Sequence, residues 1–362
     1  MKKNEQESYL IAGGGTGGHL YPAIAIAQKI RTERPRSMVY FVGSKHGIEN
    51  RVVSEKGYIL YRLSVQGFRR RLSFANLLLP GKILWSFFQS YRILKRVQPR
   101  VVIGTGGYVS GPILFVATFL GYPTLIQEQN SYPGITTRIL AKRVNRVHLS
   151  FTDSLPYFKT KDNIKITGNP VRDFTTHISK AETHTFFGLV PGKIVLLIFG
   201  GSQGARAINN MVLRIVDKLM QETAINILWS TGTAGYENVT TKAEKYPGRI
   251  AVREFIEDMG KAYKSADFCL SRAGAMTLAE LTLCGLPSIL VPYPYAADNH
   301  QEKNARSLER VGAAIVIREQ DMTPQVLYEH IFRLYHDHNL RQKMSQAAAS
   351  CLLSTPSGLA ST

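Results

Sequence analysis

Two stretches of the chain repeat one pattern: a short apolar run, a glycine-rich loop and a segment whose apolar residues have helical spacing. The first occupies residues 9–30, with its loop at Gly13–Gly18, and the second occupies residues 194–216, with its loop at Gly200–Gly204. A buried strand that leads through glycines into a helix is a common anion-binding arrangement, because free N–H groups at the helix start attract negative charge. Two separate copies predict two α/β domains that face each other across a cleft. Such an arrangement suits an enzyme that holds two phosphate-bearing molecules at once.

Strand-like and helix-like runs alternate along the chain, which indicates doubly wound, Rossmann-like parallel sheets. The strand-like runs are rich in Val, Ile and Leu without strict alternation, as expected of parallel strands covered on both faces. We expect strands at residues 9–12, 39–42, 101–104, 124–127, 146–149, 164–167, 194–199, 225–230, 268–271, 288–291 and 314–317. The turn cluster Gly168–Pro170 predicts a boundary between an N-terminal domain, residues 1–168, and a C-terminal domain, residues 169–339. A final helix-like stretch at about residues 340–355 could pack on either domain, including back on the first.

The formal net charge of +19 is unevenly distributed. Residues 1–168 hold 25 Lys/Arg and 8 Asp/Glu, whereas residues 169–362 hold 20 and 18. A basic first half attracts nucleic acid, anionic lipid headgroups or a polyanionic substrate. The alternative, a solubility charge spread over all faces, would not by itself predict this asymmetry. Because nothing in the sequence resembles a nucleic-acid recognition motif, we expect no nucleic-acid partner.

Cysteine usage and hydropathy predict a cytoplasmic protein or one that lies on a membrane surface. Cys269, Cys284 and Cys351 are scattered and form no metal-binding pattern, so we expect buried thiols in a reducing compartment. The first residues lack the apolar core of a signal peptide, and the longest apolar stretch, residues 112–126, is too short to span a bilayer.

The region from about residue 65 to residue 96 interleaves aromatic residues and leucines with cations. Two interpretations remain open. One is an interfacial membrane patch, in which apolar groups enter the bilayer while cations meet anionic headgroups. The other is an ordinary amphipathic helix whose aromatic residues face the core. The residues concerned are Gly67–Arg71, Phe74, Leu77–Leu79, Trp85, Phe87, Phe88, Arg92, Lys95 and Arg96.

The first glycine loop satisfies the G-x-G-x-x-G pattern, which is weak evidence for a dinucleotide enzyme. Such an enzyme also needs a carboxylate at the end of the second strand, and that strand ends in Gly43–Lys45. This counts against an oxidoreductase. His19 closes the loop at the predicted start of a helix, where the positive helix end favours a neutral imidazole that can accept a proton. The alternative is a histidine that only hydrogen-bonds the loop.

Further polar groups follow other predicted strands. The glycine-rich segment Gly104–Pro112 and the polar run Gln127–Asn130 are both placed at carboxyl strand ends, where open α/β sheets bind ligands. In the second half, Ser202 and the helix that begins at about Ala275 offer hydrogen-bond donors to a diphosphate. Glu280 could accept both hydroxyls of a ribose, or it could be a solvated helix residue. No D-x-D motif occurs, so we expect neither a metal nor another cofactor.

These motifs together resemble the MurG family of glycosyltransferases, family 28, which completes the lipid-linked peptidoglycan precursor of bacteria. The resemblance covers residues 9–310 and rests on Gly13–His19, Gly106–Pro112, Glu128–Asn130, Gly168–Arg172, Gly200–Ala205, Ser271–Thr277 with Glu280, and Asp298–Asn304. It implies the two-Rossmann GT-B architecture and inverting transfer of N-acetylglucosamine from UDP-GlcNAc to the C4 hydroxyl of the muramyl sugar of lipid I. It also implies an anionic membrane partner and a peripheral location on the cytoplasmic face of the bacterial inner membrane. The rival within this fold is another GT-B transferase that acts on a different sugar nucleotide or lipid.

The resemblance also implies roles for particular residues. His19 would be the catalytic base. Thr16, Gly17 and Gly18 would lie near the donor sugar and diphosphates, and Asn130 and Gln301 would contact the N-acetylglucosamine. The donor's remaining contacts would come from Arg172 and Ser202 at the phosphates, Ile256 at the uracil, and Ala275, Met276, Thr277, Leu278, Ala279 and Glu280 at the phosphates and ribose.

Overall fold

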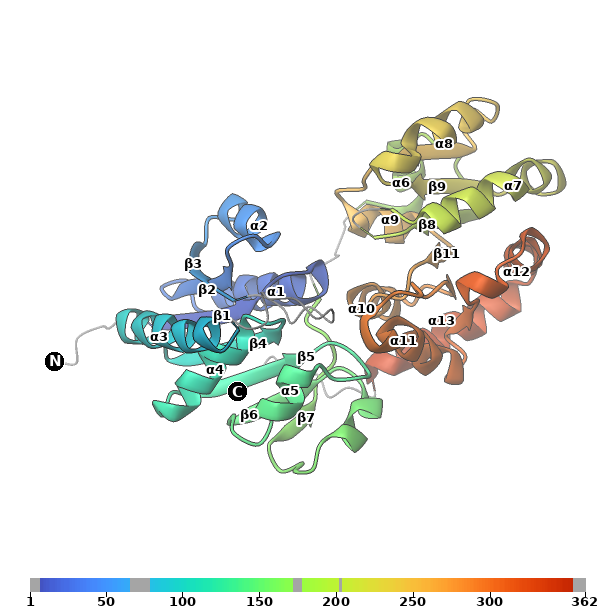
Figure 1. Cartoon of the computed structure of the whole chain (residues 1–362). Coiled ribbons are helices and arrows are strands. Elements are labelled where there is room, and N and C mark those ends of the chain that lie inside the picture. The colour runs from blue at the N-terminus through green and yellow to red at the C-terminus, as the bar shows by residue number, and fades with distance from the viewer. Residues whose placement is uncertain (1–6, 66–78, 172–177, 202–203, 354–362) are drawn as a thin grey trace. The chain divides into compact units, whose positions relative to one another are not determined.

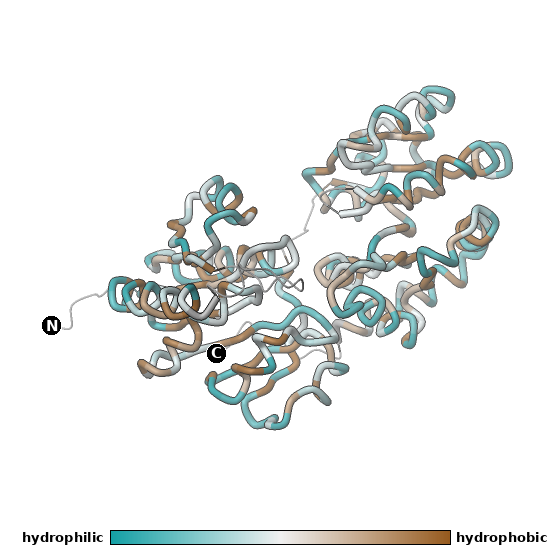
Figure 2. The backbone as a smooth tube through the Cα atoms, viewed as in Figure 1, coloured by the Kyte–Doolittle hydropathy of each residue, from teal (hydrophilic) through white to brown (hydrophobic). Residues whose placement is uncertain are grey.

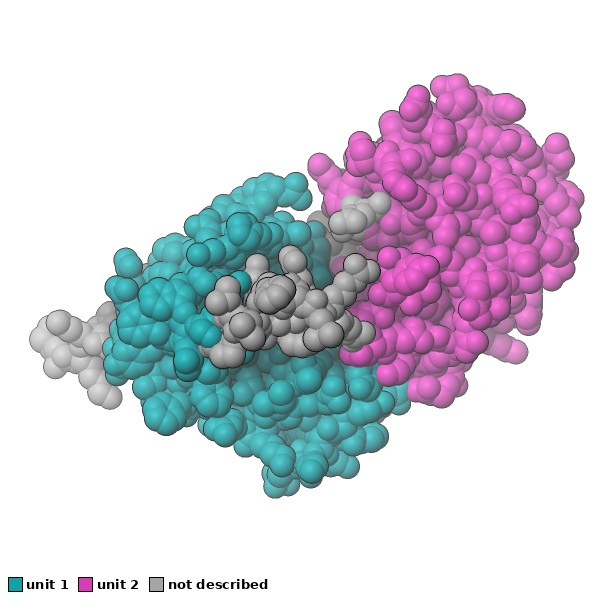
Figure 3. Space-filling model, viewed as in Figure 1, with its two compact units in different colours: residues 1–171, 357–362 teal, residues 172–356 magenta. Residues whose placement is uncertain are grey.

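A computed structural model gives the structure of the chain, and it describes residues 7–65, 79–171, 178–201 and 204–353. The described residues divide into two compact units, one within residues 1–171 and one within residues 172–356 (Figure 3). The division follows Val171, beside the Gly168–Pro170 turn cluster. Each unit is built around its own parallel sheet, with helices on both faces (Figure 1).

The first unit contains a seven-stranded parallel sheet in the order β3-β2-β1-β4-β5-β6-β7. Its strands are β1 (Ser8–Gly13), β2 (Met38–Ser44), β3 (Ile59–Leu63), β4 (Val101–Gly106), β5 (Thr124–Glu128), β6 (Arg146–Leu149) and β7 (Ile164–Ile166). Its helices are α1 (Gly17–Glu33), α2 (Glu49–Glu55), α3 (Leu79–Val97), α4 (Ser110–Phe119) and α5 (Ile135–Leu140).

The central strand β1 explains why both faces of this sheet need helices. From Tyr9 to Gly13 every residue of the strand is buried and the side chains are largely apolar, so neither face can be left to water. Ile11 joins the core on the face that α1 covers, which includes Ile24 and Phe41. Leu10 joins the opposite core with Leu94 of α3 and Ile113 of α4. Burial of these two apolar layers holds β1 between β2 and β4.

The second unit repeats this plan with a six-stranded parallel sheet in the order β10-β9-β8-β11-β12-β13. Its strands are β8 (Val195–Phe199), β9 (Asn226–Ser230), β10 (Ile250–Arg253), β11 (Phe268–Ser271), β12 (Ser288–Leu290) and β13 (Ala314–Val316). Its helices are α6 (Lys180–Phe187), α7 (Arg206–Glu222), α8 (Tyr236–Ala243), α9 (Met259–Ser265), α10 (Ala275–Leu283), α11 (His300–Arg310), α12 (Pro324–His336) and α13 (His338–Leu353).

Helix α7 illustrates how the pattern of apolar residues places a helix on this sheet. Ile208, Val212 and Leu219 recur at helical spacing and are buried against Leu196 and Ile198 of β8. In Figure 2, apolar stretches run through the strands of each unit while hydrophilic stretches lie on the outer turns and helices. Both sheets therefore have the covered, parallel construction that the sequence predicts.

The predicted doubly wound α/β architecture is confirmed, and the structure contains two strands more than the sequence predicted. The analysis of the sequence missed β3 and β10, which are the outer strands on the same side of their sheets. Both are short, each includes an arginine, and several of their side chains are not buried, so they lack the fully buried run of a central strand. The final helix, α13, which the sequence could not assign to one domain, packs against α10 and α12 of the second unit.

Candidate functional site

The strand order of each sheet identifies where a ligand is expected. In the first unit the order reverses between β1 and β4, and in the second between β8 and β11. Open parallel sheets bind ligands at such switch points, outside the carboxyl ends of the strands. The glycine loops follow these four strands, so the predicted site residues gather at the expected edge of each sheet.

A buried carboxylate fastens the first glycine loop. Glu49, in the first turn of α2, is fully buried. Its Oε2 accepts a hydrogen bond from the Gly15 N–H at 2.9 Å, and its Oε1 accepts from the Ser44 N–H and hydroxyl, each at 2.7 Å. Burial acts to raise the pKa of Glu49, but the hydrogen bonds from Gly15 and Ser44 outweigh it and hold the pKa below its ordinary value.

This contact corrects two points of the sequence analysis. A carboxylate does reach the end of β2, although it comes from Glu49 on the following helix and binds the protein's own loop. The Gly15 N–H is consequently engaged by that carboxylate, so it is not one of the donors that the loop offers to a phosphate. Sequence inspection missed Glu49 because it lies five positions beyond the strand end.

The candidate base His19 is held by one ring nitrogen. Its Nδ1 lies 3.1 Å from the Thr105 carbonyl oxygen and 3.0 Å from Oε1 of Gln129. The side-chain nitrogen of Gln129 donates to the Gln127 carbonyl at 2.8 Å, which turns its oxygen toward His19. Both neighbours of Nδ1 can only accept, so in the neutral ring the proton is on Nδ1 and Nε2 carries the unprotonated lone pair.

Gly106 makes room for this imidazole. Its φ is +104°, and a Cβ at this position would lie 2.6 Å from Nδ1 of His19. The Thr105 hydroxyl in turn donates to the His19 carbonyl at 2.7 Å. The carboxyl end of β4 thus contacts both the ring and the backbone of His19, a juxtaposition that the sequence motifs did not reveal.

The other predicted residues of the first unit lie on the same edge of the sheet. Thr16 and Gly18 are exposed at the start of α1, and Gly17 between them is half-buried. Asn130 follows β5, and its backbone N–H donates to the Glu128 carboxylate at 3.1 Å. Glu128 is buried and also accepts from α5 and the turn before it, so it anchors the segment that carries Asn130.

In the second unit, Ser202 and Arg172 lie outside the described residues. The described part of the glycine loop after β8, to which Ser202 belongs in the sequence, includes Gly204, whose φ is +72°. A Cβ on Gly204 would lie 2.1 Å from the Thr231 carbonyl oxygen, so only glycine allows this close approach to the turn after β9. The loop after β8 is therefore shaped by close backbone packing.

Helix α10 carries six of the predicted donor-binding residues. It begins at Ala275 after the Gly274 cap, and its first turn contains no acidic residue that would offset the positive helix end. Met276, Thr277 and Ala279 are half-buried, Ala275 is buried, and the Leu278 side chain is fully buried in the core. Glu280 is 9% exposed, and its Oε2 accepts a hydrogen bond from the Tyr263 hydroxyl at 2.7 Å. It is not the solvated helix residue considered as its alternative.

The two remaining predicted residues of this unit occupy loops and helix starts near α10 and β10. Gln301 lies in the first turn of α11, which packs against α10, and its Oε1 accepts from the Tyr293 N–H at 2.9 Å. Asp298 and Asn299, just before that helix, have left-handed φ values of 51° and 54°. Ile256, after β10, is buried.

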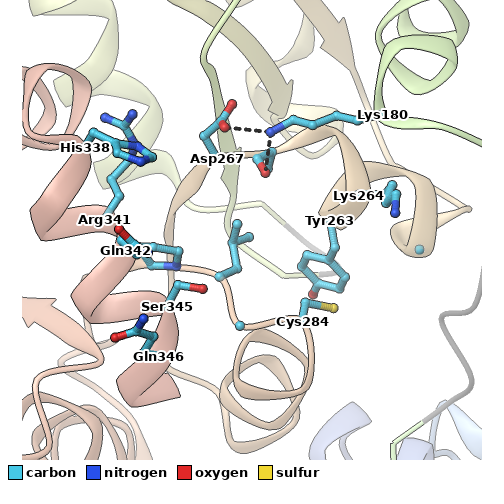
Figure 4. Close-up of a pocket in the computed structure, with 15 residues that line it drawn as sticks. Lys180, Tyr263, Lys264, Asp267, Cys284, His338, Arg341, Gln342, Ser345 and Gln346 are labelled. Atoms are coloured by element: carbon cyan, nitrogen blue, oxygen red, sulfur yellow. Dashed lines mark hydrogen bonds and ion pairs between the residues drawn. The ribbon is translucent and has the colours of Figure 1, made fainter. Parts of the chain in front are cut away.

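A cavity of about 790 Å³ also lies within the second unit, next to the amino ends of β11 and β12. Figure 4 shows Arg341, Gln342 and Ser345 of α13 on one side of it and Tyr263 of α9 across from them. Lys180 and Asp267 also line this cavity, and the ammonium group of Lys180 lies 2.6 Å from the Asp267 carboxylate. Because glycine loops and α10 begin at the opposite strand ends, this cavity is separate from the switch point.

No group of three or more His, Cys, Asp or Glu side chains suited to a metal ion occurs within residues 7–65, 79–171, 178–201 and 204–353.

Two doubly wound parallel sheets, each with glycine loops at its switch point, define a GT-B glycosyltransferase architecture. Comparison with known proteins agrees: the glycosyltransferase family 28 N-terminal domain matches residues 9–149, and the family 28 C-terminal domain matches residues 195–355. The chain belongs to glycosyltransferase family 28.

Similar proteins cover nearly the whole chain. A transferase of Ruminiclostridium cellulolyticum is 42% identical over 93% of both chains, and one of Prosthecochloris aestuarii is 45% identical with the same coverage. Each is named UDP-N-acetylglucosamine–N-acetylmuramyl-(pentapeptide) pyrophosphoryl-undecaprenol N-acetylglucosamine transferase. The crystal structure of Acinetobacter baumannii MurG aligns with a TM-score of 0.74 at 30% identity, over 96% of this chain and 95% of that one. The glycosyltransferase of kitacinnamycin, at 14% identity and a TM-score of 0.71, shares the fold.

Proposed function

We propose that this chain transfers N-acetylglucosamine from UDP-N-acetylglucosamine to the C4 hydroxyl of the muramyl sugar of lipid I, with inversion, to give lipid II and UDP. The observation that carries the proposal is the 42–45% identity to two transferases of that name over 93% of their length. The reaction serves peptidoglycan synthesis. The rival, a GT-B transferase with another acceptor, shares the fold but not this level of identity.

His19 is the base in this proposal. Inversion requires one hydroxyl to attack the anomeric carbon in line while a base accepts its proton. The carbonyl of Thr105 and the amide oxygen of Gln129 both face Nδ1, which supports a tautomer whose Nε2 is ready to accept. His19 lies at the carboxyl edge of the first sheet, and Thr16, Gly17 and Gly18 directly precede it.

The second unit binds the donor in this proposal. The start of α10 stabilises the leaving diphosphate through its N–H groups and helix dipole, with Ser202 and Arg172 as further phosphate ligands. Glu280 binds the uridine ribose, and Ile256 meets the uracil through its backbone. Gln301 and Asn130 contact the N-acetylglucosamine, and the remaining contacts come from Ala275, Met276, Thr277, Leu278 and Ala279.

The first unit also has features of a membrane-facing surface. Helix α3 buries Ile93 and Leu94 but exposes Leu84, Trp85 and Phe88. Neighbouring α5 exposes two more large apolar side chains, and Arg92, Lys95 and Arg96 are exposed on α3. No helix in the described part of the chain is long and apolar enough to cross a bilayer.

Both interpretations of residues 65–96 therefore retain support. Phe87 packs inward, with its ring 5.1 Å from that of Phe115, while Trp85 and Phe88 remain exposed. Gly67–Arg71, Phe74 and Leu77–Leu78 lie outside the described residues. An anionic bilayer would accept the exposed aromatic groups and attract the basic first half. We propose that the protein is peripheral and acts at the cytoplasmic face of the bacterial inner membrane; the exposed aromatic groups and the basic first half support contact with a membrane.

Product analysis tests the proposed reaction. Purified protein is incubated with UDP-N-acetylglucosamine and a short-chain lipid I analogue, and the product is examined by mass spectrometry and NMR. We expect one added N-acetylhexosamine, β-linked to the C4 hydroxyl of the muramyl sugar. Transfer to diacylglycerol under the same conditions, without transfer to the lipid I analogue, would favour the rival transferase.

A further inference from the structure

A buried tyrosine contacts the residue proposed to bind the donor's ribose. Tyr263, in α9, is 4% exposed, and its hydroxyl donates to Oε2 of Glu280 at 2.7 Å. The two residues lie on consecutive helices that flank β11. The contact therefore links the helix before β11 to the helix after it.

The tyrosine itself is well fixed. Its ring packs edge-on against Phe199, with centroids 6.1 Å apart, and Phe199 is the last residue of β8 before the second glycine loop. Its ring also lines the cavity of Figure 4, on the wall that includes Cys284. A rigid ring that bridges β8 and α10 can hold a flexible carboxylate in one position.

The chemistry of the pair keeps the hydrogen bond in one direction. Burial, followed by the charge of Glu280, raises the pKa of Tyr263 well above its ordinary value. The phenol consequently stays protonated and donates, while the carboxylate accepts. A charge-assisted bond of this kind also restricts the Glu280 side chain before any ligand arrives, which lowers the entropy lost on binding.

We propose that Tyr263 is a positioning residue that orients the Glu280 carboxylate toward the ribose diol, and thereby helps the enzyme to select ribonucleotide over 2′-deoxyribonucleotide donors. The inference rests on the proposed function of Glu280. A carboxylate accepts both hydroxyls of a ribose only when its two oxygens face them in the correct orientation. Tyr263 fixes that orientation through Oε2, without contact to the substrate.

Calorimetric binding of UDP and of 2′-deoxy-UDP to the full-length protein tests this role without any acceptor. In Tyr263→Phe the ring remains and only the hydroxyl is lost. We expect the UDP Kd to rise about tenfold, as for loss of a hydrogen bond to a charged group. The 2′-deoxy-UDP Kd should change much less, so the preference for UDP shrinks. In a Glu280→Ala background, Tyr263→Phe should have no further effect on the UDP Kd.

The chain offers a matched control. The Tyr246 hydroxyl donates to Oδ1 of Asp217, also at 2.7 Å, in a pair remote from the switch point. Tyr246→Phe removes the same type of bond and should leave both Kd values unchanged.

A Tyr263→Phe variant that binds UDP as the wild type does, or that weakens both nucleotides equally, would overturn the inference. Transfer to the lipid I analogue by the wild type would meanwhile leave the proposed function intact. If the wild type does not transfer the sugar but Tyr263→Phe loses the preference for UDP as expected, the proposed acceptor is overturned and the positioning role of Tyr263 is supported.

Discussion

Replacing Glu49 with glutamine removes the charge that fastens the first glycine loop to the end of β2. In the wild type, Oε1 accepts two hydrogen bonds from Ser44 and Oε2 accepts one from the Gly15 N–H. The single oxygen of glutamine can retain the Ser44 bonds, but its NH₂ group then faces the Gly15 N–H, donor against donor. A lost charge-assisted bond at a fully buried site costs about 3 kcal/mol.

Differential scanning calorimetry at neutral pH measures this loss. A free-energy change of about 3 kcal/mol corresponds to a fall in Tm of roughly 6–12 °C for a unit of this size. Glu33→Gln is the control, because that carboxylate is exposed and its ion pair with Lys29, one turn away, is exposed as well. It should leave the Tm nearly unchanged. A Glu49→Gln variant as stable as this control would refute the proposed anchoring.

The effect also has a defined pH dependence. The pKa of Glu49 is lower in the folded state than its ordinary value of 4.5, so the carboxylate adds stability that is fully present above about pH 4.5. That stability is lost as the pH falls through the lowered pKa, where the folded protein must take up a proton. The difference between wild type and Glu49→Gln should therefore shrink on acidification below pH 4.5. A difference that stays constant down to the acid unfolding transition would contradict this assignment.

Two further predictions concern the switch points, and a third concerns the cavity of Figure 4. Gln129→Met removes one acceptor from Nδ1 of His19 and should lower kcat about tenfold. In a His19→Ala background the same substitution should cause no further loss of kcat, and equal losses in both backgrounds would show that Gln129 does not act through His19. Glu280→Ala should raise the KM for UDP-N-acetylglucosamine in steady-state assays, whereas an unchanged KM would contradict its contact with ribose. Cys284 is not the buried thiol expected from the sequence, because the residue is exposed. Partial desolvation of its thiol, followed by the charge of Glu280, nonetheless raises the pKa of Cys284 to about 11, so peptide mapping should find slow iodoacetamide labelling at pH 7.5 that accelerates about tenfold per pH unit. Rapid labelling at pH 7.5 would refute the raised pKa.

The sequence was sufficient for the features that repeat or that depend on local pattern. Apolar runs followed by glycines located β1, β4, β8 and β11, because a covered parallel strand needs such a run and the turn after it needs small residues. The outer strands β3 and β10 are mostly apolar as well, but they are short, each includes an arginine, and neither is followed directly by glycines, so neither has the pattern that located the central strands.

The contacts that shape the candidate site could not be predicted from spacing. Gln129 meets His19 across 110 positions, because the order of parallel strands brings the carboxyl ends of separate strands together. Tyr263 meets Glu280 across 17, because the helix before β11 contacts the helix after it. The polarity of Gln127–Asn130 signalled a functional edge. It did not indicate which side chain would face the imidazole, since that depends on the register of β5 beside β4.

The rate of acceptor-dependent UDP release, compared between wild type and His19→Ala, tests the central claim most directly. We predict that the wild type releases UDP only when the lipid-linked muramyl acceptor is present, and that the substitution lowers turnover by about 10²–10⁴-fold while UDP still binds. UDP release at the same rate with and without the acceptor, or near-normal turnover in His19→Ala, would contradict a mechanism in which Nε2 of His19 takes the proton from the attacking hydroxyl.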